Sequence, residues 1–421
     1  MVSYQNGLEW VSAAFGLEPR WTQEPDVKII AQIARKHLDL HEQVQIDVSF
    51  HAQGAFNKLY KITAAGRACL MRISLPVYPR LKTQSEVATI NFVRQETDMP
   101  VPRILAFDAS NKNELGFEWI MMEMVSGTTL RKQWRKISWE AKQTIVRQLA
   151  HYHAQLYEKP FPKIGNLFPV VQESAFFELG PIVSLVFFWG DHLKHDVPRG
   201  PFKTSYEWLK TRLTFALADQ QRILETSDDE DDIEDAEFSI KLAEDVAEQL
   251  PKVFPPEAAS EQNVLFHDDL SMQNIMVDET GKLAAIVDWE CVSTVPLWRA
   301  CQFPQLLEGR TRDTKPQRDQ YGPDDDDEEQ DPDAPDNEGV NSLYWEHLLE
   351  YEQTELRKLF KQEMAELNAS WVATMESSTL QSDFEQAIHN CDNNWQFKVV
   401  RQWLDAFKQG DVESLAAKMI E

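Results

Sequence analysis

The sequence predicts an α+β protein in which a small antiparallel sheet precedes a larger, mostly helical part. Residues 45–124 contain five short runs with alternating apolar residues, "QIDVSF", "KLYKIT", "ACLMRIS", "VPRILAFD" and "FEWIMMEMV", and one helical pattern, "KTQSEVATINFVRQE". After Gly127 the apolar residues recur at helical spacing, as in Ile145, Leu149 and Tyr152. Five strands and one helix within about 80 residues favour a compact antiparallel unit.

These changes of pattern divide the chain into three parts. We expect an N-terminal helical extension over 1–44, a sheet-containing lobe over 45–124 and a helical lobe over 125–421. Further helices are expected at 206–224, 240–249, 342–376 and 383–407.

Two acid-rich runs, near 227–237 and 322–340, account for most of the net charge of −27. We expect both to be exposed, mobile insertions, since neither has the spaced ligands and glycine of a calcium loop. The acidity disfavours nucleic acid and anionic membranes as partners, and it is compatible with a cationic small molecule.

The sequence also indicates where the protein resides. No apolar run approaches the roughly 20 residues of a membrane span. The N-terminus lacks the pattern of a signal or transit peptide, so we expect a cytoplasmic protein. The four cysteines form no CxxC pair and predict reduced thiols, not a zinc site or a disulfide framework.

The chemistry is concentrated in "VLFHDDLSMQNIMVDETGKLAAIVDWE", which covers 264–290. It contains the pattern H-x-D-L-x-x-x-N, with His267, Asp269 and Asn274, and Asp288 follows nineteen residues after Asp269. Phosphoryl transfer needs one carboxylate to orient or deprotonate a hydroxyl, and a carboxylate with an amide oxygen to hold Mg²⁺. The alternative is an acidic loop that bonds to its own backbone.

With these residues the chain resembles the aminoglycoside phosphotransferase family of kinase-like enzymes, and especially its fungal members of unassigned substrate. The resemblance covers about residues 45–310. It implies a protein-kinase-like fold of two lobes, with Asp269 as catalytic base and Asn274 and Asp288 as magnesium ligands. Asp268 stands where many antibiotic-modifying members have glycine, so the acceptor is left open.

The resemblance extends to the residues that would bind ATP. "HAQGAFNKLY" resembles the hairpin that covers the phosphates, which implicates Gly54 and Asn57. "LMRIS" resembles the third strand of the small lobe, with Arg72 in place of the usual lysine, and Glu86 resembles its partner on the following helix. An ordinary salt bridge between strand and helix is the alternative for this pair.

The segment "IMMEMVSG" resembles the linker between the lobes, where the backbone of Glu123, Met124 and Val125 would meet the purine. A methionine-rich strand is also typical of a plain core. His151 and His153 lie two residues apart on a helix and are expected to pack or hydrogen-bond, not to bind metal.

Two further features stay open between a functional and a structural interpretation. The aromatic segment 180–202 would either wall an acceptor pocket or form a core helix and its loop. Glu290 would either face the acceptor or bond to the backbone.

We therefore predict an ATP- and Mg²⁺-dependent transferase that moves the γ-phosphate to a hydroxyl of a small molecule, with cationic and sugar-like acceptors both compatible. The alternative is a nucleotide-binding pseudokinase that serves as a scaffold or regulator. Arg72 favours this alternative, whereas the set Asp269, Asn274 and Asp288 opposes it.

Overall fold

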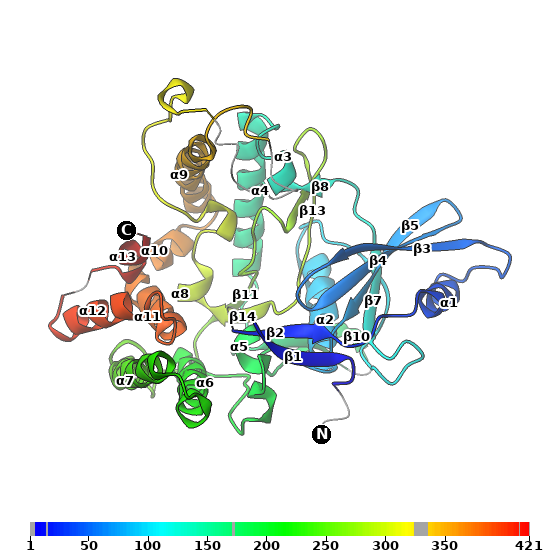
Figure 1. Cartoon of the computed structure of the whole chain (residues 1–421). Helices are drawn as coiled ribbons and strands as arrows, with labels where there is room; N and C mark the ends of the chain where they lie inside the picture. The colour runs from blue at the N-terminus through cyan, green and yellow to red at the C-terminus, as the bar shows by residue number, and fades with distance from the viewer. Residues whose placement is uncertain (1–4, 14–15, 171–172, 324–335, 412, 421) are drawn as a thin grey trace.

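The computed structural model describes residues 5–13, 16–170, 173–323, 336–411 and 413–420. Figure 1 shows two lobes, with a β-sheet in the N-terminal lobe on the right and a larger group of helices on the left. The N-terminal lobe is built on one five-stranded antiparallel sheet of order β3-β4-β5-β7-β6. Its strands are β3 (Ile46–Gln53), β4 (Asn57–Ala64), β5 (Arg67–Ser74), β6 (Ile104–Asp108) and β7 (Glu118–Glu123).

One helix covers each face of this sheet. Helix α1 (Val27–His37) buries Ile30 and Ile33 against the side chains of Tyr60, Ile62 and Met71. Helix α2 (Leu81–Glu96) lies on the other face, where Val87 packs with Ile120 and Met122. Successive residues of a strand point to opposite faces, so the adjacent Met121 and Met122 serve different cores.

The N-terminal extension is only partly helical, so that prediction was wrong for residues 8–13 and 16–21. Strands β1 (Leu8–Ala13) and β2 (Gly16–Trp21) form an antiparallel hairpin before α1. Trp10 packs on Trp189 of the C-terminal lobe, with ring centroids 5.0 Å apart, and Trp21 packs on Phe117 of the sheet at 5.1 Å. The hairpin thus joins both lobes, and these distant aromatic partners decide its conformation.

The two lobes are joined through residues 124–129. Strand β8 (Thr128–Thr129) pairs with β12 (Ile275–Val277), which in turn pairs with β13 (Leu283–Ile286). A second pair consists of β11 (Asn263–Phe266) and β14 (Ser293–Pro296), and β9 (Asn166–Val170) pairs with β10 (Glu173–Gly180). These short strands pass through the helical lobe and position the loop between β11 and β12.

Helices make up the rest of the C-terminal lobe, with α4 at its centre (Figure 1). They are α3 (Leu130–Gln133), α4 (Trp139–Tyr157), α5 (Leu185–Phe188), α6 (Ser205–Thr226), α7 (Glu230–Val253), α8 (Leu297–Ala300), α9 (Ser342–Leu367), α10 (Ala369–Ser377), α11 (Thr379–Asn390), α12 (Phe397–Lys408) and α13 (Leu415–Ile420). In the part of the chain that the structure describes, no helix has the length and apolarity needed to cross a membrane.

The predicted helices are present, although two of them are divided. The pattern over 342–376 breaks at Asn368, which ends α9 and caps α10 by accepting a hydrogen bond from the Trp371 amide. The pattern over 383–407 breaks between α11 and α12. Local capping chemistry ends a helix even where the apolar spacing continues.

The first acid-rich run is largely exposed, as predicted, but it is mostly helical and not a loop. Asp229 caps α7 by accepting from two backbone amides, and Glu230, Asp231 and Asp232 form its first turn. Acids at a helix N-terminus are favourable because they face the positive end of the helix dipole. Most of the second run lies outside the described residues.

Candidate active site

The loop between β11 and β12 presents Asp269 at the surface while its neighbours are anchored. Asn274 donates from Nδ2 to the carboxylate Oδ2 of Asp269 at 2.9 Å and to its backbone oxygen at 2.9 Å. His267 is buried, with its Nε2 3.2 Å from the carbonyl oxygen of Val287 and its ring edge against Trp289. Asp269 is therefore held in one orientation by the residue five positions later.

Asp288 follows β13 in a turn with unusual backbone geometry. Its φ is +64° and that of Cys291 is +61°, in the left-handed region that L-residues seldom adopt. Between them Trp289 is 1% exposed and donates to the carbonyl oxygen of Ile286 at 3.0 Å. The turn buries the tryptophan and leaves the carboxylates on either side of it facing the N-terminal lobe.

Arg72, which lies in the sheet of the N-terminal lobe, binds these carboxylates. Its guanidinium donates to Glu86 Oε1 on α2 at 2.8 Å and to Asp288 Oδ1 at 3.0 Å, and Nη2 lies 2.6 Å from Glu290 Oε2. The Arg72–Glu86 pair was predicted from the sequence. The structure extends it to two acids more than 200 positions away in the chain, so Arg72 connects the two lobes.

Lys82, which the sequence reasoning missed, completes this buried group. It lies in the first turn of α2, is 1% exposed, pairs with Glu290 and donates to Asn57 Oδ1 at 3.2 Å. Asn57 also accepts from the Ser74 hydroxyl at 2.8 Å and donates to Glu290 Oε2 at 2.9 Å. A lysine in a helix usually points to solvent, so no sequence signal indicated that Lys82 is buried.

The burial of the cluster shifts its pKa values in opposite directions. Burial alone would raise the pKa of Glu290, but Arg72 and Lys82 lower it to about 2. Burial opposes the charge of Arg72, yet its three carboxylate partners raise its pKa above the usual value. For Glu86 burial prevails over Arg72 and raises the pKa to about 7. Glu290 is accordingly the carboxylate that keeps its charge most firmly.

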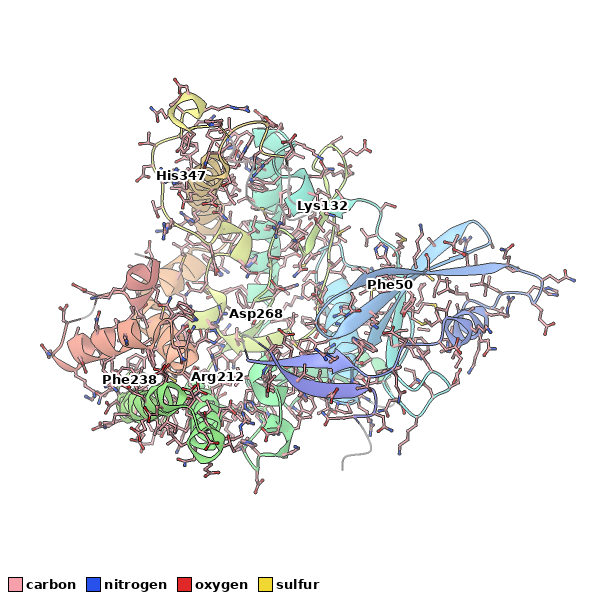
Figure 2. The ribbon with its side chains drawn as sticks, viewed as in Figure 1. Phe50, Lys132, Arg212, Phe238, Asp268 and His347 are labelled. Atoms are coloured by element: carbon pink, nitrogen blue, oxygen red, sulfur yellow. The ribbon has the colours of Figure 1, made fainter. Side chains whose placement is uncertain are left out.

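Asp269 lies outside this cluster, but the charge of the cluster affects its pKa. Its partial burial raises the pKa of its carboxyl, and the nearby charge of Asp288 raises it further, while the hydrogen bond from Asn274 lowers it. Figure 2 shows that Asp268, the preceding residue, lies near the centre of the molecule, whereas Phe50 lies out on the N-terminal sheet. The side chains of Asp268 and Asp269 are both exposed.

The other predicted nucleotide-binding residues do not join the cluster. Gly54 lies at the exposed turn between β3 and β4, where its amide donates to the carbonyl oxygen of Asn57. Glu123 ends β7, and together with Met124 and Val125 it lines an open cavity of about 560 Å³. The rest of its lining is Arg94, Thr97, Asp98, Met99, Pro100, Val101, Pro102, Ser126, Ala284 and Ala285.

The two histidines of α4 make hydrogen bonds, as predicted, and part of the aromatic segment contributes to the core. His153 donates from Nδ1 to the carbonyl oxygen of Leu149, packs on Phe360, and has a pKa that burial lowers to about 4. His151 is exposed and lies 3.2 Å from Asp98. In the aromatic segment, Phe187 and Phe188 are fully buried. All four cysteines are unpaired thiols, as expected.

The predicted metal ligands fit a magnesium ion by the chemistry of their free atoms. The Asn274 nitrogen is occupied by Asp269, which leaves the amide oxygen as the donor available to a cation. The Asp288 carboxylate is 37% exposed and already binds a cationic group. Hard oxygen donors of this kind are what Mg²⁺ requires.

A two-lobed fold with an oriented aspartate, an Asn–Asp oxygen pair and a buried arginine between the lobes has the parts that phosphoryl transfer uses. The chain belongs to the Phosphotransferase enzyme family, whose model matches residues 47–299.

Individual proteins are similar to this chain to different extents. The subtelomeric hrmA-associated cluster protein of Aspergillus fumigatus is 26% identical over 308 residues, 61% of this chain and 60% of that protein. The chain thus spans about three fifths of that relative's length. Altered inheritance of mitochondria protein 9 of Meyerozyma guilliermondii is 29% identical over 123 residues, 28% of this chain and 20% of that protein.

Among solved structures, the ADP-bound aminoglycoside phosphotransferase APH(2'')-Ib superposes with a TM-score of 0.47 at 9% identity. The superposition covers 90% of this chain and 97% of that chain.

Proposed function

We propose that the protein is an ATP- and Mg²⁺-dependent phosphotransferase that moves the γ-phosphate to a hydroxyl of a small molecule. The observation that carries the proposal is the pairing of Asp269 with Asn274 at 2.9 Å, beside an Asp288 that meets Arg72 at 3.0 Å. Asn274 would orient Asp269 as the base. Arg72, in the N-terminal lobe that would bind the nucleotide, would hold the metal-binding carboxylate of Asp288.

Asp269 would act on the acceptor hydroxyl. Its Oδ2 accepts from Asn274, so the other carboxylate oxygen is presented in a defined direction. A fixed carboxylate can accept the proton of a hydroxyl within hydrogen-bond reach as the new O–P bond forms. The raised pKa of Asp269 makes it a better proton acceptor than an ordinary carboxylate.

Asn274 and Asp288 would hold the metal, which supplies positive charge to the phosphates when bound. Arg72 would add a cation on the opposite side, from β5. Arginine keeps its charge and bonds phosphate oxygens through two donors, so its presence instead of lysine does not remove this function. The exposed acids 268 and 269 favour an acceptor that carries positive charge or many hydroxyls.

One observation favours the alternative of a nucleotide-binding pseudokinase. The donors of Arg72 already contact three carboxylates, so phosphate would have to displace Asp288 or Glu290 from the guanidinium. A weakly active or inactive protein would keep this arrangement when ATP is added.

The test measures ATP consumption with Mg²⁺ and a panel of hydroxylated metabolites, including amino sugars and choline-like alcohols. The Asp269→Asn variant has nearly the same shape and lacks the base, so turnover should fall by about 10²–10⁴-fold while ATP still raises the melting temperature. Stabilisation by ATP without turnover on any acceptor would favour the pseudokinase. The absence of both stabilisation and turnover would refute nucleotide binding.

A further inference from the structure

The ammonium group of Lys82 is buried where the two lobes meet, and its hydrogen-bonding partners are a carboxylate and an amide oxygen. It pairs with Glu290 Oε2, the same oxygen that lies 2.6 Å from Arg72 Nη2, and it donates to Asn57. The ring of Phe56 lies 6.0 Å from Nζ. Two cations from different elements therefore share one carboxylate oxygen.

A buried charge persists only where other charges and hydrogen bonds compensate it. Asn57 bonds both Lys82 and Glu290, so the pair is also fixed in geometry. Glu290 is thereby neutralised by a residue that is itself enclosed, with 1% of its surface exposed. Without Lys82, the full charge of Glu290 would fall on Arg72, which already binds Glu86 and Asp288.

We propose that Lys82 is a positioning residue for ATP: it offsets the charge of Glu290, so that Arg72 keeps positive charge for the phosphates. This inference rests on the proposed function, because it concerns the nucleotide of that reaction. Lys82 itself is enclosed and would not contact the nucleotide. Its effect would be electrostatic, exerted through Glu290 and Arg72.

The charges make a specific prediction for four proteins. Lys82→Met removes one positive charge, so that Arg72 alone must compensate Glu290. The double variant Lys82→Met/Glu290→Gln removes one charge of each sign. We expect Lys82→Met to weaken ATP binding about tenfold, since a charge a few ångströms away has an effect of this order. The double variant should recover to within about threefold of the wild type.

The probes separate charge from packing. Dissociation constants are measured with Mg²⁺ for ATP, ADP and adenosine by calorimetry, in the wild type, each single variant and the double variant. The loss in Lys82→Met should be largest for ATP, smaller for ADP and absent for adenosine, because adenosine has no phosphate. Raising the salt concentration should change the loss little, because buried charges are screened much less than exposed ones.

Lys142 offers a matched control. It is also a buried lysine, with its Nζ 2.7 Å from Glu352, but that pair joins α4 to α9 away from the cluster. Lys142→Met should lower the melting temperature and leave the ATP constant unchanged. It measures the cost of losing a buried lysine without the proposed electrostatic effect.

The outcomes are distinct. A double variant as weak as Lys82→Met, or an equal loss for adenosine, would overturn the inference and leave a packing role for Lys82. A wild type that binds neither ATP nor ADP would refute the proposed function, and the inference would fall with it. Rescue by Glu290→Gln with an ATP-selective loss would support it.

Discussion

Gly127, at the start of the second lobe, is the position where a single methyl group should disturb the connection between the lobes. Its φ is +127°, and a Cβ there would lie 2.4 Å from the carbonyl oxygen of Val277. A carbon normally approaches such an oxygen to about 3.3 Å, so Gly127→Ala must move the backbone by roughly 1 Å. Val277 pairs with Thr128, in the hairpin that follows Asn274.

The expected cost combines two terms. An unfavourable φ costs about 1–3 kcal/mol, and overpacking in a close contact costs about another 1–3 kcal/mol. Gly127→Ala should therefore destabilise by about 2–6 kcal/mol, a large share of a typical domain's 5–15 kcal/mol. Urea denaturation followed by tryptophan fluorescence measures it.

Gly66→Ala is the matched control, because Gly66 has φ +73° and nothing within 4 Å of its Cβ position. It should cost about 1–2 kcal/mol from the backbone conformation alone. If both variants shift the denaturation midpoint equally, the close contact with β12 contributes nothing and the reasoning about the linker is wrong.

Three other experiments test the site, the titration and the hairpin. Because asparagine tolerates the positive φ of Asp288, Asp288→Asn should abolish turnover without unfolding, whereas Asp288→Ala should also lose about 1 kcal/mol in urea denaturation. Burial raises the pKa of Asp392 to about 6, so the stability that its protonated form contributes should be lost as the pH rises from about 4 through 6. Asp392→Asn should flatten this dependence in melting curves, and an unchanged slope would contradict the assignment. Trp10→Ala removes the contact with Trp189 and should speed hydrogen exchange over 8–21 by about tenfold or more, while Glu9→Ala, on the exposed face, should not.

Parts of the candidate site were predictable because they are local in the chain. Asp269 and Asn274 are five residues apart in one loop, and the apolar runs around them predict its strands. The Arg72–Glu86 pair joins a strand to the next helix, fourteen residues on. Short separations of this kind limit the geometry, so a sequence pattern is enough to propose the contact.

The remaining parts depend on long-range packing. Asn57 meets Glu290 across 233 positions, and Arg72 meets Asp288 across 216. No periodicity indicates that a helical lysine is buried, or that an N-terminal segment forms a hairpin against Trp189. Such contacts arise only when both lobes are folded.

By itself the sequence determined the class of fold and the H-x-D-L-x-x-x-N motif, because the first follows from apolar spacing and the second is local in the chain, and the resemblance to a family indicated the Arg72–Glu86 pair. Only the tertiary structure decided that Glu290 is shared by two cations and that Lys82 is one of them. The physical reason is that burial makes a charge costly until a specific partner is in place, and that partner comes from the other lobe.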